Sequence, residues 1–265
     1  MTTLAEFTLV FISGLITALA TGLGALPYFF KDEVSDRWTV GLWGLASGIM
    51  ISASVFGLVL EGLAEGTIFQ VLTGGFLGGV LVFIADKVIH RFNYEPEELP
   101  KADFTKLVLI LGILTVHSFP EGVAIGVSFA DLNLAAGIDF LGFTVPVLAV
   151  FMTIAISIHN IPEGLAISIP IKRLGLSKYS MVWWAVFSSL PQPIGAVIAY
   201  YFVTLARAFL PYGFGFAAGA MSVLVVHHLI PEGLEEGEDL EGGGKKEMAT
   251  GLVVGFLSML PLVLF

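Results

Sequence analysis

Two hexapeptides that each contain a histidine and a glutamate recur 42 positions apart, at residues 117–122 and 159–164. The first is His-Ser-Phe-Pro-Glu-Gly and the second is His-Asn-Ile-Pro-Glu-Gly. In each, the His precedes the Glu by four residues, so on a helix the two side chains are neighbours on one face. Imidazole nitrogen and carboxylate oxygen together suit Zn²⁺, and also Fe²⁺ or Mn²⁺. If the two segments lie side by side, the sequence predicts a divalent-metal site formed by His117, Glu121, His159 and Glu163.

Each His–Glu pair could instead be a buried ion pair that holds helices together, because a buried pair need not be functional. The duplication of the pair, beside the duplicated prolines Pro120 and Pro162, favours the metal site. Because imidazole must be neutral to bind a metal, we expect binding to weaken as the pH falls.

The segments that carry these residues are expected to lie in a membrane. Of the 265 residues 56% are hydrophobic and 13% are charged, whereas a soluble domain has roughly 25% charged residues. The apolar runs do not alternate as barrel strands do, so helices are indicated. The fold class predicted is an all-α integral membrane protein with one transmembrane domain over residues 1–265. Its eight helices are expected at about 7–30, 38–60, 67–85, 107–130, 140–171, 179–206, 208–231 and 248–265.

The basic residues predict how this domain is oriented. With eight spans, the odd-numbered connections hold eleven of the 12 Lys and Arg residues, and the even-numbered ones hold only Arg207. The positive-inside rule then places both termini outside. Joining spans six and seven would put Arg207 in the hydrocarbon, so they are expected to be separate. We expect a multi-pass protein of the plasma membrane, in contact with lipid.

A second repeat relates span two to span seven. Gly48, Met50 and Glu61 recur 171 positions later as Gly219, Met221 and Glu232. The two spans would cross the membrane in opposite directions, as in transporters built from inverted repeats, whose site lies near the midplane. A charged side chain at that depth costs roughly 2.5–3.5 kcal/mol on insertion scales, so Glu121 and Glu163 require partners.

Composition excludes several other classes. A net charge of −10 argues against a nucleic-acid partner, and the absence of cysteine excludes disulfides and thiolate ligands. An intramembrane metalloenzyme such as a protease is an alternative, but the sequence has no His-Glu-x-x-His motif and leaves no obvious general base. We therefore expect no enzyme activity and no cofactor other than the metal. A structural metal in a transporter of something else is a third interpretation.

The paired motifs, on the fourth and fifth of eight spans, resemble those of the ZIP family of divalent-metal transporters. The resemblance covers essentially the whole chain. It implies a three-two-three helix bundle with inverted repeats that moves Zn²⁺, and also Cd²⁺, Fe²⁺ or Mn²⁺, into the cytoplasm. Carried over, the ligands between spans four and five would be His117, Glu121, His159 and Glu163, with Met50 as a soft thioether ligand.

The sequence departs from family members that hold two metals. Those members commonly have Asn, Asp and Glu where this chain has Ser118, Asn160 and Gln192. We therefore predict one tightly held metal and at most a weak second one. The resemblance also suggests a cytoplasmic exit route, although capping of helix ends is the alternative; its candidates are His227, His228, Glu232, Asp86 and His90. The glycine-rich apolar faces would allow a homodimer.

Overall fold

The computed structural model describes residues 3–30, 34–89, 118–134 and 137–260, together with Gly112 and Thr115. In this part of the chain, six helical segments are long and apolar enough to cross a membrane. This confirms an all-α membrane protein with several spans. The six segments are Leu4–Phe30, Asp36–Glu65, Ile68–Val88, Val147–Lys172, Lys178–Leu205 and Arg207–Glu235.

The two remaining predicted spans are described only in part. Most of residues 107–130 lies outside the described ranges, and within them the structure has a helix at 118–128. At the other end of the chain, helix α12 (Lys245–Ser258) covers the first part of the predicted span 248–265. The count of eight spans therefore stays a prediction.

Several of the long segments are composite. The first contains α1 (Leu4–Thr21), a 3₁₀ turn at Gly22–Ala25 and α2 (Pro27–Phe30). The second contains α3 (Asp36–Ser52), a π-helical turn at Ala53–Val59 and α4 (Leu60–Glu65). The third is α5 (Ile68–Ile89), and α7 runs over Val147–Arg173. The last comprises a 3₁₀ turn at Arg207–Phe209, α10 (Leu210–Leu224), a π-helical turn at Val225–Leu229 and α11 (Ile230–Glu235).

The sixth predicted span is two helices, α8 (Lys178–Ser189) and α9 (Pro191–Leu205). The division falls at Leu190 because Pro191 has no N–H to continue the helix and is suited to the first position of a new one. The predicted separation of spans six and seven is confirmed: α9 ends at Leu205, and Ala206 is extended, with φ −147° and ψ 99°.

The expected start of span five at residue 140 was wrong. Residues Gly137–Phe140 (β1) and Phe143–Pro146 (β2) form an antiparallel hairpin, and α7 begins only at Val147. Leu141 and Gly142 both have positive φ, 49° and 84°, which fits the two-residue turn that favours hairpins. An apolar run alone does not distinguish a short strand from the first turns of a helix.

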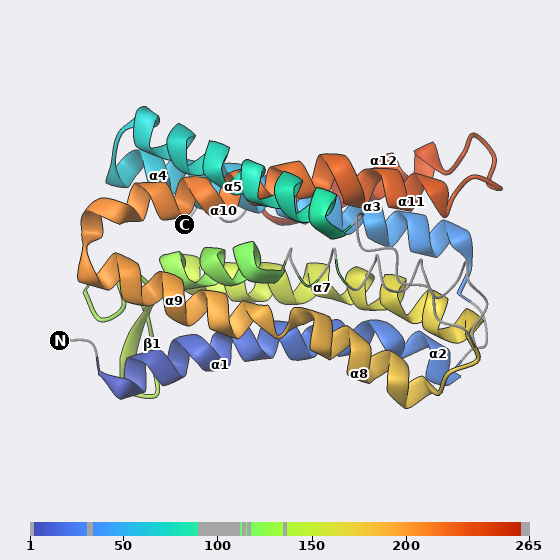
Figure 1. Cartoon of the computed structure of the whole chain (residues 1–265), viewed down its shortest axis with the longest axis horizontal. Coiled ribbons are helices and arrows are strands. Elements are labelled where there is room, and N and C mark those ends of the chain that lie inside the picture. The colour runs from blue at the N-terminus through green and yellow to red at the C-terminus, as the bar shows by residue number, and fades with distance from the viewer. Residues whose placement is uncertain are drawn as a thin grey trace.

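The helices form two layers (Figure 1). One layer contains α3, α4, α5, α10, α11 and α12, and the other contains α1, α2, α7, α8 and α9. We call the end of the bundle with the α9–α10 connection the Arg207 end, and the end with the α7–α8 connection the Lys172 end. Buried apolar residues from both layers, such as Met50 and Met152, belong to one core between them.

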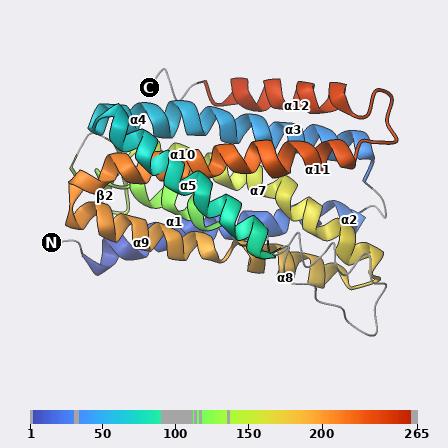
Figure 2. The same cartoon turned by 45° about the horizontal axis from the view of Figure 1, so that its top comes forward.

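The two segments that are related by the 171-position offset also pack in the same way. α3 lies along α12 and α10 lies along α5, and a Cβ atom at Gly48 or at Gly219 would overlap the backbone of Leu252 or Gly75 respectively. Each of these helices continues into a π-helical turn. The segments run in opposite directions, α3 to α4 toward the Arg207 end and α10 to α11 away from it (Figure 2). Small residues allow this close approach without a bulky side chain between the helices.

Candidate metal site

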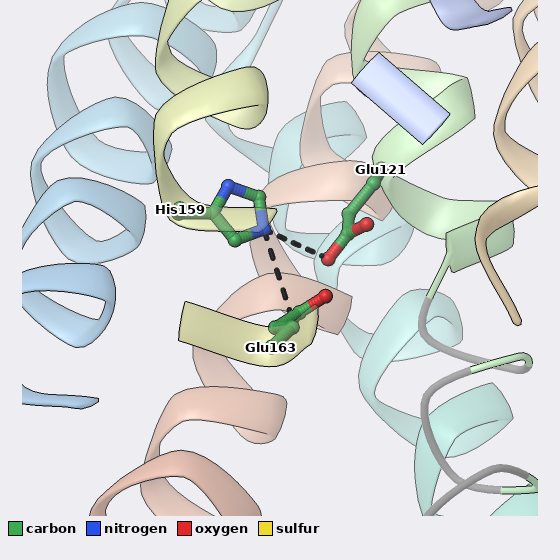
Figure 3. Close-up of side chains that lie close together, drawn as sticks. All are labelled: Glu121, His159 and Glu163. Atoms are coloured by element: carbon green, nitrogen blue, oxygen red, sulfur yellow. Dashed lines mark hydrogen bonds and ion pairs between the residues drawn. The ribbon is translucent and has the colours of Figure 1, made fainter. Parts of the chain in front are cut away.

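Glu121, His159 and Glu163 come together between the helix at 118–128 and α7 (Figure 3). Their exposed fractions are 0%, 1% and 1%. The Nε2 atom of His159 is 3.1 Å from Oε1 of Glu121 and 3.8 Å from Oε1 of Glu163. One ligand atom from each residue lies within 4.8 Å of the other two. Three of the four predicted ligands are therefore side by side, and the fourth, His117, lies outside the described residues.

Local sequence explains one of the two contacts of His159, the one with Glu163. His159 and Glu163 are one turn apart on α7, so their side chains meet whenever this segment is helical. Glu121 comes from another helix and needs a tertiary contact. That contact includes Gly122, where a Cβ atom would overlap the backbone carbonyl of Gln192 in α9. Without a side chain at Gly122, the backbone of the helix at 118–128 can touch the start of α9.

The electrostatics of the cluster favour a cation. Two carboxylates are buried together, and among the described residues neither makes an ion pair with a Lys or Arg. The Nδ1 atom of His159 and the Oε1 atom of Glu163 are buried without a hydrogen-bond partner in the same set. An uncompensated buried charge is costly, and a divalent cation bound by nitrogen and oxygen would compensate two carboxylates. The donor set thus fits Zn²⁺ or a similar ion.

Two further predicted site residues contact this cluster or each other. The Nε2 atom of Gln192 donates a hydrogen bond of 2.6 Å to Oε2 of Glu121. The Nδ2 atom of Asn160 donates to Oε1 of Gln192, at 3.1 Å. Both side chains are fully buried. Both NH₂ groups and the carbonyl oxygen of Gln192 bond to other protein groups, whereas Oδ1 of Asn160 is buried without a hydrogen-bond partner among the described residues. A direct role of either side chain on the metal stays a prediction.

The structure also places Ser118 and Met50. Ser118 is buried at the start of the helix at 118–128, three residues before Glu121. Met50 is fully buried in α3 and belongs to the core between the two layers. Neither position tests whether the side chain binds a metal.

Four of the five predicted exit residues lie in the described part of the chain, on α5, on the π-helical turn at Val225–Leu229 and on α11. Nε2 of His228, in the π-helical turn before α11, is 3.4 Å from Oδ1 of Asp86 in α5. Glu232 lies on α11, four residues after His228. His227 is exposed on the surface of the helix, and His90 lies outside the described residues. The structure therefore brings Asp86 and His228 together, and a role of any of these residues in the exit of the ion stays a prediction.

Sequence reasoning missed one residue of the cluster's surroundings, Thr17 on α1. Its hydroxyl oxygen is 2.6 Å from Oε1 of Gln192, and its backbone carbonyl accepts from Nδ2 of Asn160 at 2.8 Å. A signal was present: Ser13, Thr17 and Thr21 recur every four residues in an otherwise apolar span, and all three are buried. That spacing places small polar groups on one face of the helix.

Fold and cluster together define a class: a multi-pass helical membrane protein with a buried site for a cation. Comparisons with known proteins identify the family. The model of the ZIP zinc transporters matches residues 95–263. The chain belongs to this family, and it is a transporter, not an enzyme.

Individual relatives agree. The chain is 30% identical over 262 residues to the zinc transporter GufA of Myxococcus xanthus, covering 95% of this chain and 96% of GufA. It is 33% identical over 257 residues to the zinc transporter ZIPB of Bordetella bronchiseptica, covering 91% and 76% of the two chains. A third relative, an Arabidopsis thaliana protein named for zinc transport, is 38% identical over 223 residues, covering 84% of this chain. The chain spans only 34% of the length of that protein.

Proposed function

We propose that this chain moves Zn²⁺ across a plasma membrane into the cytoplasm, and that the ion binds between spans four and five. Cd²⁺, Fe²⁺ and Mn²⁺ are candidate ions as well. The observation that carries the proposal is the pair of buried carboxylates, Glu121 and Glu163, beside His159 and without a Lys or Arg partner within the described ranges.

Charge balance favours one ion at a time. The two carboxylates offset the charge of one divalent cation, and such compensation lowers the cost of carrying the ion across the hydrocarbon. The neutral amides of Asn160 and Gln192 add no further negative charge. A second divalent ion at the same place would leave an excess of positive charge in a buried site.

The proposed topology has eight spans with both termini outside. Its support is the positive-inside distribution of Lys and Arg, together with the antiparallel arrangement of α3 and α10. In this orientation the Lys172 end faces the cytoplasm, so the ion would leave past His228 and Asp86. The antiparallel repeat supports alternating access, since related halves can exchange roles at the two faces.

An intramembrane metalloprotease with the same ligands is not favoured. A hydrolytic metal site keeps an open position and a nearby general base. Here the only carboxylates of the described cluster are Glu121 and Glu163, and both face His159 as candidate ligands. The family comparison also points to transport.

Metal uptake into proteoliposomes tests the proposal. Zn²⁺, Cd²⁺, Mn²⁺ and Fe²⁺ are supplied in parallel to the wild type, to the His159→Ala, Glu163→Ala double variant and to Glu238→Ala, a control in an exposed turn. We expect uptake by the wild type and the control, and none by the double variant. Failure of the wild type to carry any of these ions would refute the proposal, and normal uptake by the double variant would refute the site.

A further inference from the structure

A chain of hydrogen bonds connects α1 to the metal-site carboxylate through two buried amides. The Thr17 backbone carbonyl accepts from Nδ2 of Asn160 at 2.8 Å, and the same nitrogen donates to Oε1 of Gln192 at 3.1 Å. The Thr17 hydroxyl is 2.6 Å from that Oε1 atom, and 2.8 Å from the backbone carbonyl oxygen of Gly14. The Nε2 atom of Gln192 then donates to Oε2 of Glu121 at 2.6 Å. All four side chains are fully buried.

The direction of each bond follows from the first one. A backbone carbonyl can only accept, so the group of Asn160 that faces the Thr17 carbonyl must be its NH₂. That NH₂ also faces Gln192, which must therefore present its carbonyl oxygen to Asn160. The NH₂ of Gln192 is then directed at Glu121. A backbone atom of α1 thus sets the orientation of both amides.

In this orientation the two carboxylate oxygens of Glu121 have different partners. Oε2 accepts the hydrogen bond from Gln192, while Oε1 faces Nε2 of His159. The carbonyl oxygen of Gln192 is also engaged, since the Asn160 amide and the Thr17 hydroxyl both lie within hydrogen-bond distance of it. Oε1 of Glu121 therefore faces the His159 side, where an ion would be bound, while Oε2 and the carbonyl oxygen of Gln192 face hydrogen-bond donors of the protein.

We propose that Gln192 is a positioning residue, held by Asn160 and Thr17, that fixes Glu121 as a one-oxygen ligand of the transported metal. This inference rests on the proposed function, because it concerns the same site. Gln192 acts through Glu121 and does not itself touch the ion. A hydrogen bond from a neutral amide orients the carboxylate without changing the charge of the site, whereas a Lys or Arg there would cancel part of it.

The predicted consequence is a loss of metal affinity when the chain of bonds is cut. Gln192→Leu removes the donor to Glu121 and introduces no group that could bind a metal. A hydrogen bond to a charged group contributes enough that we expect the dissociation constant to rise about tenfold. Thr17→Val removes the hydroxyl and keeps the backbone carbonyl, so a rise of about threefold is expected. Thr17→Ser retains the hydroxyl and should bind like the wild type.

The experiment is titration of each purified variant with Cd²⁺ and with Zn²⁺ by calorimetry, and X-ray absorption spectroscopy of the Cd²⁺-loaded forms. Weaker binding by Gln192→Leu and Thr17→Val, wild-type binding by Thr17→Ser and the same number of ligands in all four would support the proposal. Equal affinity in all variants would overturn it. Loss of one oxygen ligand in Gln192→Leu would also overturn it, because Gln192 would then be a ligand.

The thermal unfolding temperature of each metal-free variant separates positioning from a structural role. A merely structural residue would lower that temperature and leave the metal affinity of the folded protein unchanged, which would count against the proposal. If Gln192→Leu does not fold, the comparison of Thr17→Val with Thr17→Ser decides. Affinity is measured without transport. Failure of the wild type to take up metal would therefore refute the proposed function, and the comparison of metal affinities between the variants would still be valid.

Discussion

Two acidic clusters in this protein differ in where their positive charge comes from. At the Arg207 end, Nη2 of Arg207 lies 2.8 Å from Oδ1 of Asp131 and 3.5 Å from Oε2 of Glu65. These three side chains are 48%, 36% and 33% exposed. In the metal site, Glu121 and Glu163 are buried and have no such partner among the described residues. Each cluster has two carboxylates, but among the described residues only the first also contains a Lys or Arg.

Burial determines how strongly the charges within each cluster interact. Water and salt screen the exposed cluster, so its ion pairs contribute about 0–1 kcal/mol each. In the buried cluster screening is weak, and an uncompensated carboxylate is costly. The exposed cluster is complete in itself and ties the end of α4 to the α9–α10 connection. In the buried one, the proposed metal ion would supply the positive charge that no Lys or Arg of the described residues provides.

The largest expected effect comes from removing one buried charge. Glu163→Gln keeps the shape of the side chain and takes away the repulsion with Glu121. We expect uptake to be abolished and the unfolding temperature of the metal-free protein to rise. Uptake in proteoliposomes and thermal unfolding without metal measure the two effects. A lower unfolding temperature in the folded variant would mean that a positive group of the protein already balances the charge of Glu163. That result would contradict the difference drawn between the two clusters.

Metal should stabilise the wild type strongly. Binding to the folded state alone adds about 2.7 kcal/mol when free Zn²⁺ is 100 times its dissociation constant. We expect a clear rise in unfolding temperature and one tightly bound equivalent after exhaustive dialysis. Thermal unfolding and elemental analysis measure these quantities. Glu163→Gln should show little of the rise, and retention of two equivalents by the wild type would contradict the single-ion proposal.

An intermediate effect is expected at the half-buried pair of His228 and Asp86. If this pair lies on the exit route, His228→Ala should slow uptake several-fold and leave the affinity of the central site unchanged. Uptake rates and calorimetric titration give the two quantities. Glu238→Ala is the control, because Glu238 lies in an exposed turn and is not among the predicted route residues. Equal uptake by the two variants would remove His228 from the route.

The smallest effect is expected at the exposed cluster. Arg207→Ala should lower the free energy of unfolding by about 1 kcal/mol or less. Because solvent screens these ion pairs, raising the salt concentration should reduce the difference between variant and wild type. Chemical unfolding at low and high salt is the measurement. If Arg207→Ala lowered the free energy of unfolding as much as breaking a buried ion pair does, the different exposure of the two clusters would not explain the difference in their energetics.

Much of the fold could be predicted because a helix that crosses a membrane needs a long apolar segment, which is visible in the sequence. Long apolar runs gave the six helical segments, and Arg207 marked the separation of spans six and seven. The hairpin before α7 was not predictable in the same way. Its residues are as apolar as a helix start, and the left-handed conformations of Leu141 and Gly142 that close the turn are a property of the folded chain.

The candidate site was predictable where its geometry is local. The spacing of His159 and Glu163 gives a shared helix face, and the cost of a buried carboxylate requires a partner. Gln192 was a candidate ligand from its place in the sequence, yet in the structure its amide donates to Glu121. Thr17 was not among the predicted residues. Contacts between side chains on different helices depend on how the helices cross, and residue spacing does not contain that information.

The sequence by itself therefore determined that this protein lies in a membrane, that two carboxylates are placed inside it and that related segments occur in pairs. These follow from side-chain chemistry and helix periodicity, which act over a few residues. Only the tertiary structure decided which groups meet the carboxylates: His159 on one oxygen of Glu121, Gln192 on the other, and no Lys or Arg in the described part of the chain. Those contacts join helices far apart in sequence, and close packing between backbones at glycines such as Gly122 fixes them.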